Sequence, residues 1–199
     1  MPKYAAIRSK LQTGDIVLFS GKGGISTGIK WMTDSKWSHV GMVINVPEWD
    51  FVLLWESTTL SSLRDLETGT ARKGVQLVPL SERIQSYNGE ASVRHLTCQR
   101  TPQMANTLSA LRKEVKGRPY EEYETELIKA AYDGPLGANT EDLRTLFCSE
   151  LVAEAYQRMG ILSEDPASNE YTPKDFSEAG KLKLLKGSTL SKEIKIQRG

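Results

Sequence analysis

The chain has 199 residues, of which 39% are apolar, and its 26 basic and 25 acidic side chains leave a formal net charge of +1. This length fits a single domain with a sizeable core, and the balanced charge favours neither nucleic acid nor an anionic membrane as a partner. No apolar run approaches the ~20 residues of a membrane span, and the N-terminal stretch lacks the apolar centre of a signal peptide. We therefore expect a cytoplasmic protein.

The first elements along the chain are a strand, a short helix and a hairpin. The segment Ile16–Phe19 is predicted to be a strand, and residues 25–33 a short helix that leads towards Ser38. The apolar, strand-forming runs His39–Val46 and Phe51–Glu56 flank a turn-like break. This pattern predicts two antiparallel strands joined by a short connection.

Alternation along this hairpin places its two titratable residues on defined faces. His39 shares a face with Gly41 and Val43, because successive side chains of a strand point to opposite sides. Gly41 leaves space beside the imidazole, which suits an approaching helix or substrate. Glu56 ends the apolar face that contains Leu54, and a buried carboxylate needs a partner. A glutamate that accepts from one imidazole nitrogen would fix the tautomer of His39; the alternatives are a histidine bonded to a loop and a solvent-exposed glutamate.

The middle of the chain adds a polar insert, two strands and a helix. The polar stretch 57–74 is a candidate groove wall or mobile lid. Strands are expected over Val75–Pro79 and Val93–Thr97. Apolar spacing predicts a helix from Pro102, a residue favoured at the first helical position, to Gly117.

A helix that carries a cysteine follows in the last third of the chain. Before it, a further helix is expected over Tyr123–Tyr132, with a loop at 133–137. Cys148 lies in the first turn of the next helix, whose apolar stripe indicates core packing and which ends at Gly160. Unpaired N–H groups and about half a positive charge at a helix N-terminus favour thiolate over thiol. The alternative for Cys148 is a buried small hydrophobe.

The other candidate groups have weaker contexts. His95 lies in a short alternating strand with no neighbouring motif, and Cys98 follows the same strand. Both cysteines are expected to be reduced, because nothing in the chain resembles a secreted disulfide scaffold. No spacing typical of a metal site is present, so neither a metal nor another cofactor is expected.

The C-terminal segment 181–199 is basic. It is typical of a solvated terminal tail, and the alternatives are an aid to binding anionic lipid headgroups and an edge strand around 193–196. The cations of this segment are Lys181, Lys183, Lys186, Lys192, Lys195 and Arg198.

An ordered set of motifs resembles the circularly permuted branch of the NlpC-type papain-like proteins, which includes YiiX-like proteins, poxvirus relatives and, more distantly, the lecithin:retinol acyltransferase group. Histidine comes first and cysteine last, which is the permuted order. The resemblance covers roughly residues 12–180 and rests on Gly14–Phe19, Ser38–Val43, Glu56-Ser57, Gly74–Leu80, Phe147–Val152 and Tyr171–Phe176.

The resemblance implies a fold and a set of roles. The expected fold is α+β, a mostly antiparallel sheet with helices packed on it, in a single domain over 1–199 with its core at about 12–180. Cys148 would be the nucleophile, His39 the base and Glu56 the residue that orients it. The polar insert 57–74 is the main departure. The second oxyanion donor, the substrate-binding residues and the oligomeric state are not predicted.

Two classes of function follow. The first is a thiol hydrolase or acyltransferase that forms an acyl-enzyme on Cys148, with either a cell-wall-type peptide amide or a lipid acyl group as substrate. The second is a non-catalytic module that keeps the fold and binds a lipid or peptide in the groove. In both classes the partner is a small molecule, peptide or lipid rather than a nucleic acid.

Overall fold

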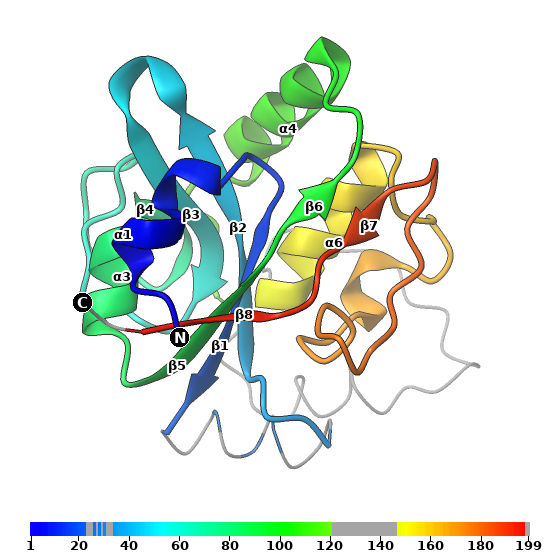
Figure 1. The fold of residues 1–199 in the computed structure, drawn as a ribbon. Helices are drawn as coiled ribbons and strands as arrows, with labels where there is room; N and C mark the ends of the chain where they lie inside the picture. Colours follow the sequence, from blue (N-terminus) through cyan, green and yellow to red (C-terminus); the bar gives the residue numbers. More distant parts are fainter. Residues whose placement is uncertain (23–25, 27, 29, 31–33, 121–146, 198–199) are drawn as a thin grey trace.

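The computed structural model describes residues 1–22, 26, 28, 30, 34–120 and 147–197. Its centre is a six-stranded sheet in the order β4-β3-β2-β1-β5-β8, in which every neighbouring pair is antiparallel (Figure 1). The strands are β1 (Ile16–Gly21), β2 (His39–Val46), β3 (Phe51–Thr58), β4 (Gly74–Pro79), β5 (Gly89–Arg94) and β8 (Ile194–Ile196).

The predicted hairpin is the pair β2 and β3. The 3₁₀ turn η2 (Pro47–Trp49) and Asp50, whose φ is +51°, connect the two strands. Val46 pairs with Phe51 and Met42 with Trp55, which fixes the register. The predicted antiparallel pairing is therefore confirmed, although β3 extends two residues beyond Glu56.

Helices cover both faces of the sheet. On one face lie α4 (Pro102–Val115) and α6 (Cys148–Arg158); on the other lie α1 (Tyr4–Ile7), the 3₁₀ turn η1 (Arg8–Lys10) and α3 (Leu80–Ser86) (Figure 1). A third 3₁₀ turn, η3 (Ser168–Glu170), packs against α6. The fold is thus α+β with a mostly antiparallel sheet, as the sequence predicts.

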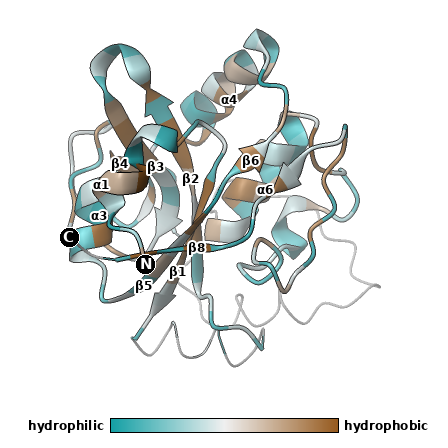
Figure 2. Ribbon diagram, viewed as in Figure 1, coloured by the Kyte–Doolittle hydropathy of each residue, from teal (hydrophilic) through white to brown (hydrophobic). Residues whose placement is uncertain are grey.

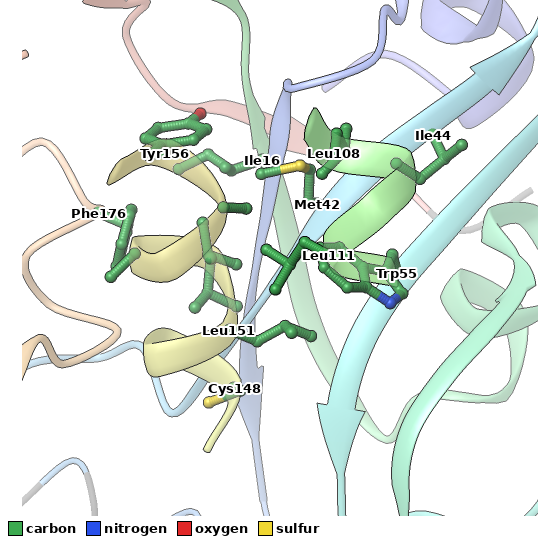
Figure 3. Packing of buried hydrophobic residues seen from close by; sticks show 14 of the residues in the cluster. Ile16, Met42, Ile44, Trp55, Leu108, Leu111, Cys148, Leu151, Tyr156 and Phe176 are labelled. Atoms are coloured by element: carbon green, nitrogen blue, oxygen red, sulfur yellow. The ribbon is translucent and has the colours of Figure 1, made fainter. Parts of the chain in front are cut away.

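The two faces bury separate hydrophobic clusters. Val40, Met42 and Ile44 belong to the cluster under α4 and α6, whereas Val43 belongs to the cluster under α1 and α3. Figure 2 shows the hydrophobic residues running along the central strands and α6, and Figure 3 shows Leu151 of α6 in the first cluster. The alternation predicted for β2 is confirmed, and the side of β2 that carries His39 is the side facing α1 and α3.

One predicted strand is divided in two. The segment 93–97 is split between β5 and the short strand β6 (Leu96–Thr97), which pairs with β7 (Thr189–Leu190) in a separate two-stranded sheet. The carboxylate of Asp15 accepts the backbone N–H of Leu96 at 2.9 Å and lies 2.7 Å from the imidazole of His95. These side-chain bonds replace ladder bonds of the main sheet, so the chain leaves that sheet at His95.

The C-terminal segment belongs to the folded domain. Strand β8 pairs with β5, and Ile196 is buried in the cluster under α1. The solvated tail favoured by the sequence is therefore wrong for residues up to 197, and the edge-strand alternative is confirmed. Several cations of the segment are still exposed, among them Lys183, Lys192 and Lys195.

The remaining predictions concern the ends of the helices and the absence of a membrane-spanning segment. The helix predicted over 102–117 ends at Val115, and the helix and loop predicted over 123–137 lie outside the described residues, as does most of the short helix at 25–33. Within the part of the chain that the structure describes, no helix combines the length and apolarity needed to cross a bilayer.

Candidate active site

Cys148 is the first residue of α6. The carboxylate of Glu150 accepts the backbone N–H of Phe147 at 3.1 Å, which stabilises the start of the helix. Leu151 and Val152 are fully buried in the cluster under α4 and α6, so the helix is held firmly against β2 and β3 (Figure 3). Packing of α6 thus fixes the position of the thiol, which is 4% exposed.

His39 is the first residue of β2, at the end of the sheet. Its imidazole is buried against the ring of Phe19, with the ring centroids 5.5 Å apart. Nε2 lies 2.6 Å from Oε2 of Glu56, and this leaves Nδ1 as the nitrogen that can face the thiol of Cys148. The structure therefore brings together the three residues that the sequence singled out.

The charge of His39 reflects both partners. Burial alone would lower the pKa of its imidazole, but the charge of Cys148, a hydrogen bond with Cys148 and the carboxylate of Glu56 together raise it to about 9. An imidazolium is therefore favoured at neutral pH when the thiol is ionised. This is the arrangement that an ion pair between thiolate and imidazolium requires.

Glu56 lies between two cations. Its Oε1 accepts from Nε of Arg83 at 2.7 Å, while Oε2 faces His39. Burial would raise the pKa of this fully buried carboxyl, but the hydrogen bond with His39 and the charge of Arg83 outweigh burial and lower it. Glu56 is thus held ionised inside the protein.

The space beside Gly41 is used differently from what the sequence suggests. A Cβ at this position would lie 2.8 Å from Cδ1 of Leu54 and 3.2 Å from Cβ of Glu56. The expected helix or substrate does not occupy this space. It is taken by β3, which allows Glu56 to approach His39.

A pocket of about 360 Å³, lined mostly by residues whose side chains carry a polar group, opens beside His39. Tyr120 closes one side, buried and with its ring edge-on to Phe147 at 5.8 Å between centroids. Burial, and next the charge of Cys148, raise the pKa of the Tyr120 phenol. The remaining lining residues are Gly21, Lys22, Ser26, Ser38, Thr58, Thr59, Leu60, Ser62, Ser86, Tyr87 and Asn88.

The polar insert after Glu56 contributes Thr58, Thr59, Leu60 and Ser62 to the lining of this pocket, which fits the groove-wall alternative. Asp65 gives the insert a fixed shape: its carboxylate accepts from the backbone N–H groups of Glu67, Thr68 and Leu77 at 2.9–3.1 Å. The insert is therefore folded against β4.

The model of a family described as permuted papain-like amidase enzymes, YaeF/YiiX, C92 family, matches residues 10–193. The chain belongs to this family. The match covers nearly all of the sequence and includes the elements that carry Cys148, His39 and Glu56. No curated protein sequence gives a significant match.

This C92 domain also shares its fold with a solved structure. The crystal structure of metalloprotein yiiX from Escherichia coli O157:H7 superposes with a TM-score of 0.53 at 18% sequence identity, over 95% of this chain and 98% of that one. In residues 1–120 and 147–197, apart from the few positions near 23–33 left undescribed, no group of three or more His, Cys, Asp and Glu side chains could hold a metal ion.

The other two candidates lie away from the pocket. His95 binds the buried carboxylate of Asp15, with Nδ1 and Oδ2 2.7 Å apart, and this pair anchors β1 to the start of β6. Cys98 is half-buried and free, and Cys148 is free as well, in agreement with the expected reduced thiols. Burial raises the pKa of the Cys98 thiol.

Arg83 is the residue in contact with Glu56 that the sequence did not point to. It lies on α3, a helix of seven residues whose only sequence signal is Leu80 and Ile84 at helical spacing. An arginine in such a segment resembles a surface residue. Arg83 is buried because α3 packs against β3, and this tertiary contact places its side chain beside Glu56.

Proposed function

We propose that this chain is a cysteine amidase in which Cys148 is the nucleophile, His39 transfers the proton and Glu56 orients His39. The observation that carries the proposal is the position of one buried imidazole between a carboxylate at 2.6 Å and the thiol at the start of α6. Membership of an amidase family supports the reaction class.

The first half-reaction forms a thioester. The thiolate of Cys148 attacks the amide carbonyl carbon, and the carbonyl electron pair moves to oxygen to give a tetrahedral intermediate. When this intermediate collapses, the C–N bond breaks and the departing amine takes the proton of the His39 imidazolium. The neutral imidazole keeps its hydrogen bond with Glu56, so its ring does not rotate.

The second half-reaction regenerates the site. Neutral His39 takes a proton from water, the resulting hydroxide attacks the thioester carbon, and the C–S bond breaks to release a carboxylic acid. The thiolate of Cys148 and the imidazolium of His39 are then restored. Replacement of water by another acceptor would make the same site an acyltransferase.

The start of α6 supplies stabilisation for the oxyanion. The backbone N–H of Cys148 is in the first turn of the helix and has no acceptor within the helix itself. Such a donor at the positive end of the helix dipole suits the negative oxygen of the tetrahedral intermediate. We assign it as the first oxyanion donor.

The pocket favours a peptide-type amide over a lipid acyl chain. Most of its lining side chains carry a hydroxyl, an amide or a charge, and among the described lining residues Leu60 is the only aliphatic one. A fatty acyl chain would leave these polar groups without water or hydrogen-bond partners, which is unfavourable. A substrate with amide and hydroxyl groups can satisfy them.

Trapping of the acyl-enzyme tests this function. The protein is incubated with the p-nitrophenyl esters of N-acetylglycine and of octanoic acid, and intact mass is followed together with release of p-nitrophenol. We expect a transient adduct on Cys148 that forms faster with the acetylglycyl ester. Cys98→Ala is the matched control and retains the adduct, whereas Cys148→Ala loses it.

Two results would contradict the proposal. Equal adduct formation in Cys148→Ala would place the nucleophile elsewhere. Absence of any adduct in a folded protein would leave the non-catalytic binding module as the better account. Faster transfer of the octanoyl group would reject the peptide-type substrate while keeping the thiol chemistry.

A further inference from the structure

Arg83 is a buried cation whose guanidinium makes few hydrogen bonds to the described residues. It is fully buried, and its Nε donates to Glu56 at 2.7 Å. Its two terminal nitrogens, Nη1 and Nη2, are also buried and have no hydrogen-bond partner among the described residues. Burial of unsatisfied donors is unfavourable. An arginine selected for stability alone would be expected to satisfy them, so its charge calls for another explanation.

Charge balance provides that explanation. With Cys148 as thiolate and His39 as imidazolium, the buried group contains two anions and two cations, the other two being Glu56 and Arg83. Without Arg83 the same state would carry a net negative charge away from water. Burial would then favour either protonation of Glu56 or return of the proton from His39 to the thiol.

The remaining titratable groups around the site do not supply the missing charge. Lys22, the lysine among the described lining residues of the pocket, is exposed to water and is not among the groups that shift the pKa of Glu56. Tyr87 and Tyr120 line the pocket beside His39, and burial raises the pKa of both phenols, which keeps them neutral. The electrostatic influences on Glu56 come from His39 and Arg83. Arg83 is therefore the cation that compensates Glu56 when His39 compensates the thiolate.

We propose that Arg83 is a positioning residue that neutralises and holds Glu56 and thereby makes the thiolate–imidazolium pair the resting state of the site. The inference rests on the proposed roles of Cys148 and His39. Arg83 touches neither the thiol nor the substrate pocket in the described contacts; it acts through Glu56.

The rate of iodoacetamide alkylation of Cys148 against pH, in a Cys98→Ala background, tests this role. We expect Arg83→Met to move the midpoint of the rate profile upward by about one pH unit, which is a rate about tenfold lower below the midpoint. The rate at high pH should not change, because the substitution does not alter the exposure of the thiol. Arg83→Lys restores the charge and should return the midpoint towards that of the native protein.

Two controls separate charge from folding. Arg94 is a second buried arginine, but its partners are the carbonyl oxygens of Phe176, Leu190 and Ser191. Arg94→Met should lower the melting temperature without moving the midpoint. If Arg83→Met does not fold, the double variant Arg83→Met/Glu56→Gln decides, because it removes both buried charges; we expect its profile to match that of Glu56→Gln alone.

The outcomes are distinct for the two proposals. The role of Arg83 is rejected, while the triad stands, if the midpoint for Arg83→Met does not move upward or if the profile of the double variant differs from that of Glu56→Gln. The same holds if the midpoint for Arg83→Lys equals that for Arg83→Met. If the native midpoint is no lower than that of His39→Ala, the proposed function itself fails.

Discussion

In the proposed mechanism, the chemistry depends on His39, because this residue must hold a proton in one half-reaction and lose it in the other. Its pKa of about 9 means that the imidazolium is present below that pH and is lost above it. Glu56 fixes the ring through a 2.6 Å contact, so a change in protonation does not change its orientation. The same residue is therefore available first as an acid and then as a base.

The basic limb of the pH profile follows from this value. We expect amide turnover to fall above about pH 9, because neutral His39 cannot protonate the departing amine. Alkylation of Cys148 needs no leaving-group proton, so its rate should stay constant over the same range. Parallel profiles of p-nitroanilide hydrolysis and iodoacetamide labelling measure the difference, and a matching fall in both rates would contradict it.

Part of this site follows from residue patterns. Period-two alternation groups His39 with Gly41 on one strand and Glu56 with Leu54 on the next, and helix periodicity puts Cys148 in a first turn; the structure agrees with each. Arg83 and the hydroxyl groups around Tyr87 do not follow, because their burial depends on how α3 packs. Alternation also leaves the neighbour of Gly41 undetermined, since only the strand register shows that β3 fills that space.

At the scale of elements, the hairpin of β2 and β3 sets the distance between histidine and glutamate. Gly41 is the residue that permits the close approach of the two strands' side chains on this face. The nearest atoms to a Cβ there belong to Leu54, which can adjust, and to the Cβ of Glu56, which is fixed by the strand.

Substitution of Gly41 tests this geometry. We expect Gly41→Ala to displace Glu56 from His39 and to reduce turnover by about tenfold or more, since small misplacements of catalytic groups carry large losses. Gly28→Ala is the control, because no atom of the described residues lies within 4 Å of its added Cβ. Comparison of kcat/KM and of circular dichroism spectra separates misplacement from unfolding. Unchanged turnover in Gly41→Ala would show that the hairpin tolerates the methyl group.

Across the whole molecule, the C-terminal segment braces the chain just before β2. Glu193 accepts from Nε1 of the buried Trp37 at 2.9 Å and from the backbone N–H of Glu178 at 3.1 Å, and it pairs with Lys36 at 3.1 Å. Trp37 lies two residues before His39, so the residue that precedes β8 helps to fix the segment that leads into β2. The lysines of this segment predict a solvated tail, because a sequence pattern does not show the tertiary partners of Glu193.

The stability of this brace depends on pH. Burial would raise the pKa of Glu193, but the hydrogen bond from Glu178 and the contacts with Lys36 and Trp37 lower it. A lowered pKa means that the stabilisation is complete above the unfolded value of about 4.3 and is lost as pH falls through the folded value. We expect Glu193→Gln to lower the free energy of unfolding at pH 7 by about 1–3 kcal/mol, with a smaller difference near pH 3.

Urea denaturation followed by tryptophan fluorescence measures this difference at both pH values. Glu90→Gln is the matched control, because its pair with Lys195 is long, at 3.5 Å, and exposed. A loss in Glu193→Gln that equals the loss in Glu90→Gln at pH 7 would show that the brace contributes no more than a surface pair.

The central claim is that His39 activates Cys148, and the pH dependence of iodoacetamide labelling at Cys148 tests it most directly. The protein and its His39→Ala variant are compared in the Cys98→Ala background, so that one thiol is observed. The account predicts a native midpoint at a clearly lower pH than that of the variant. Coincident profiles would mean that no ion pair forms, and would contradict the account.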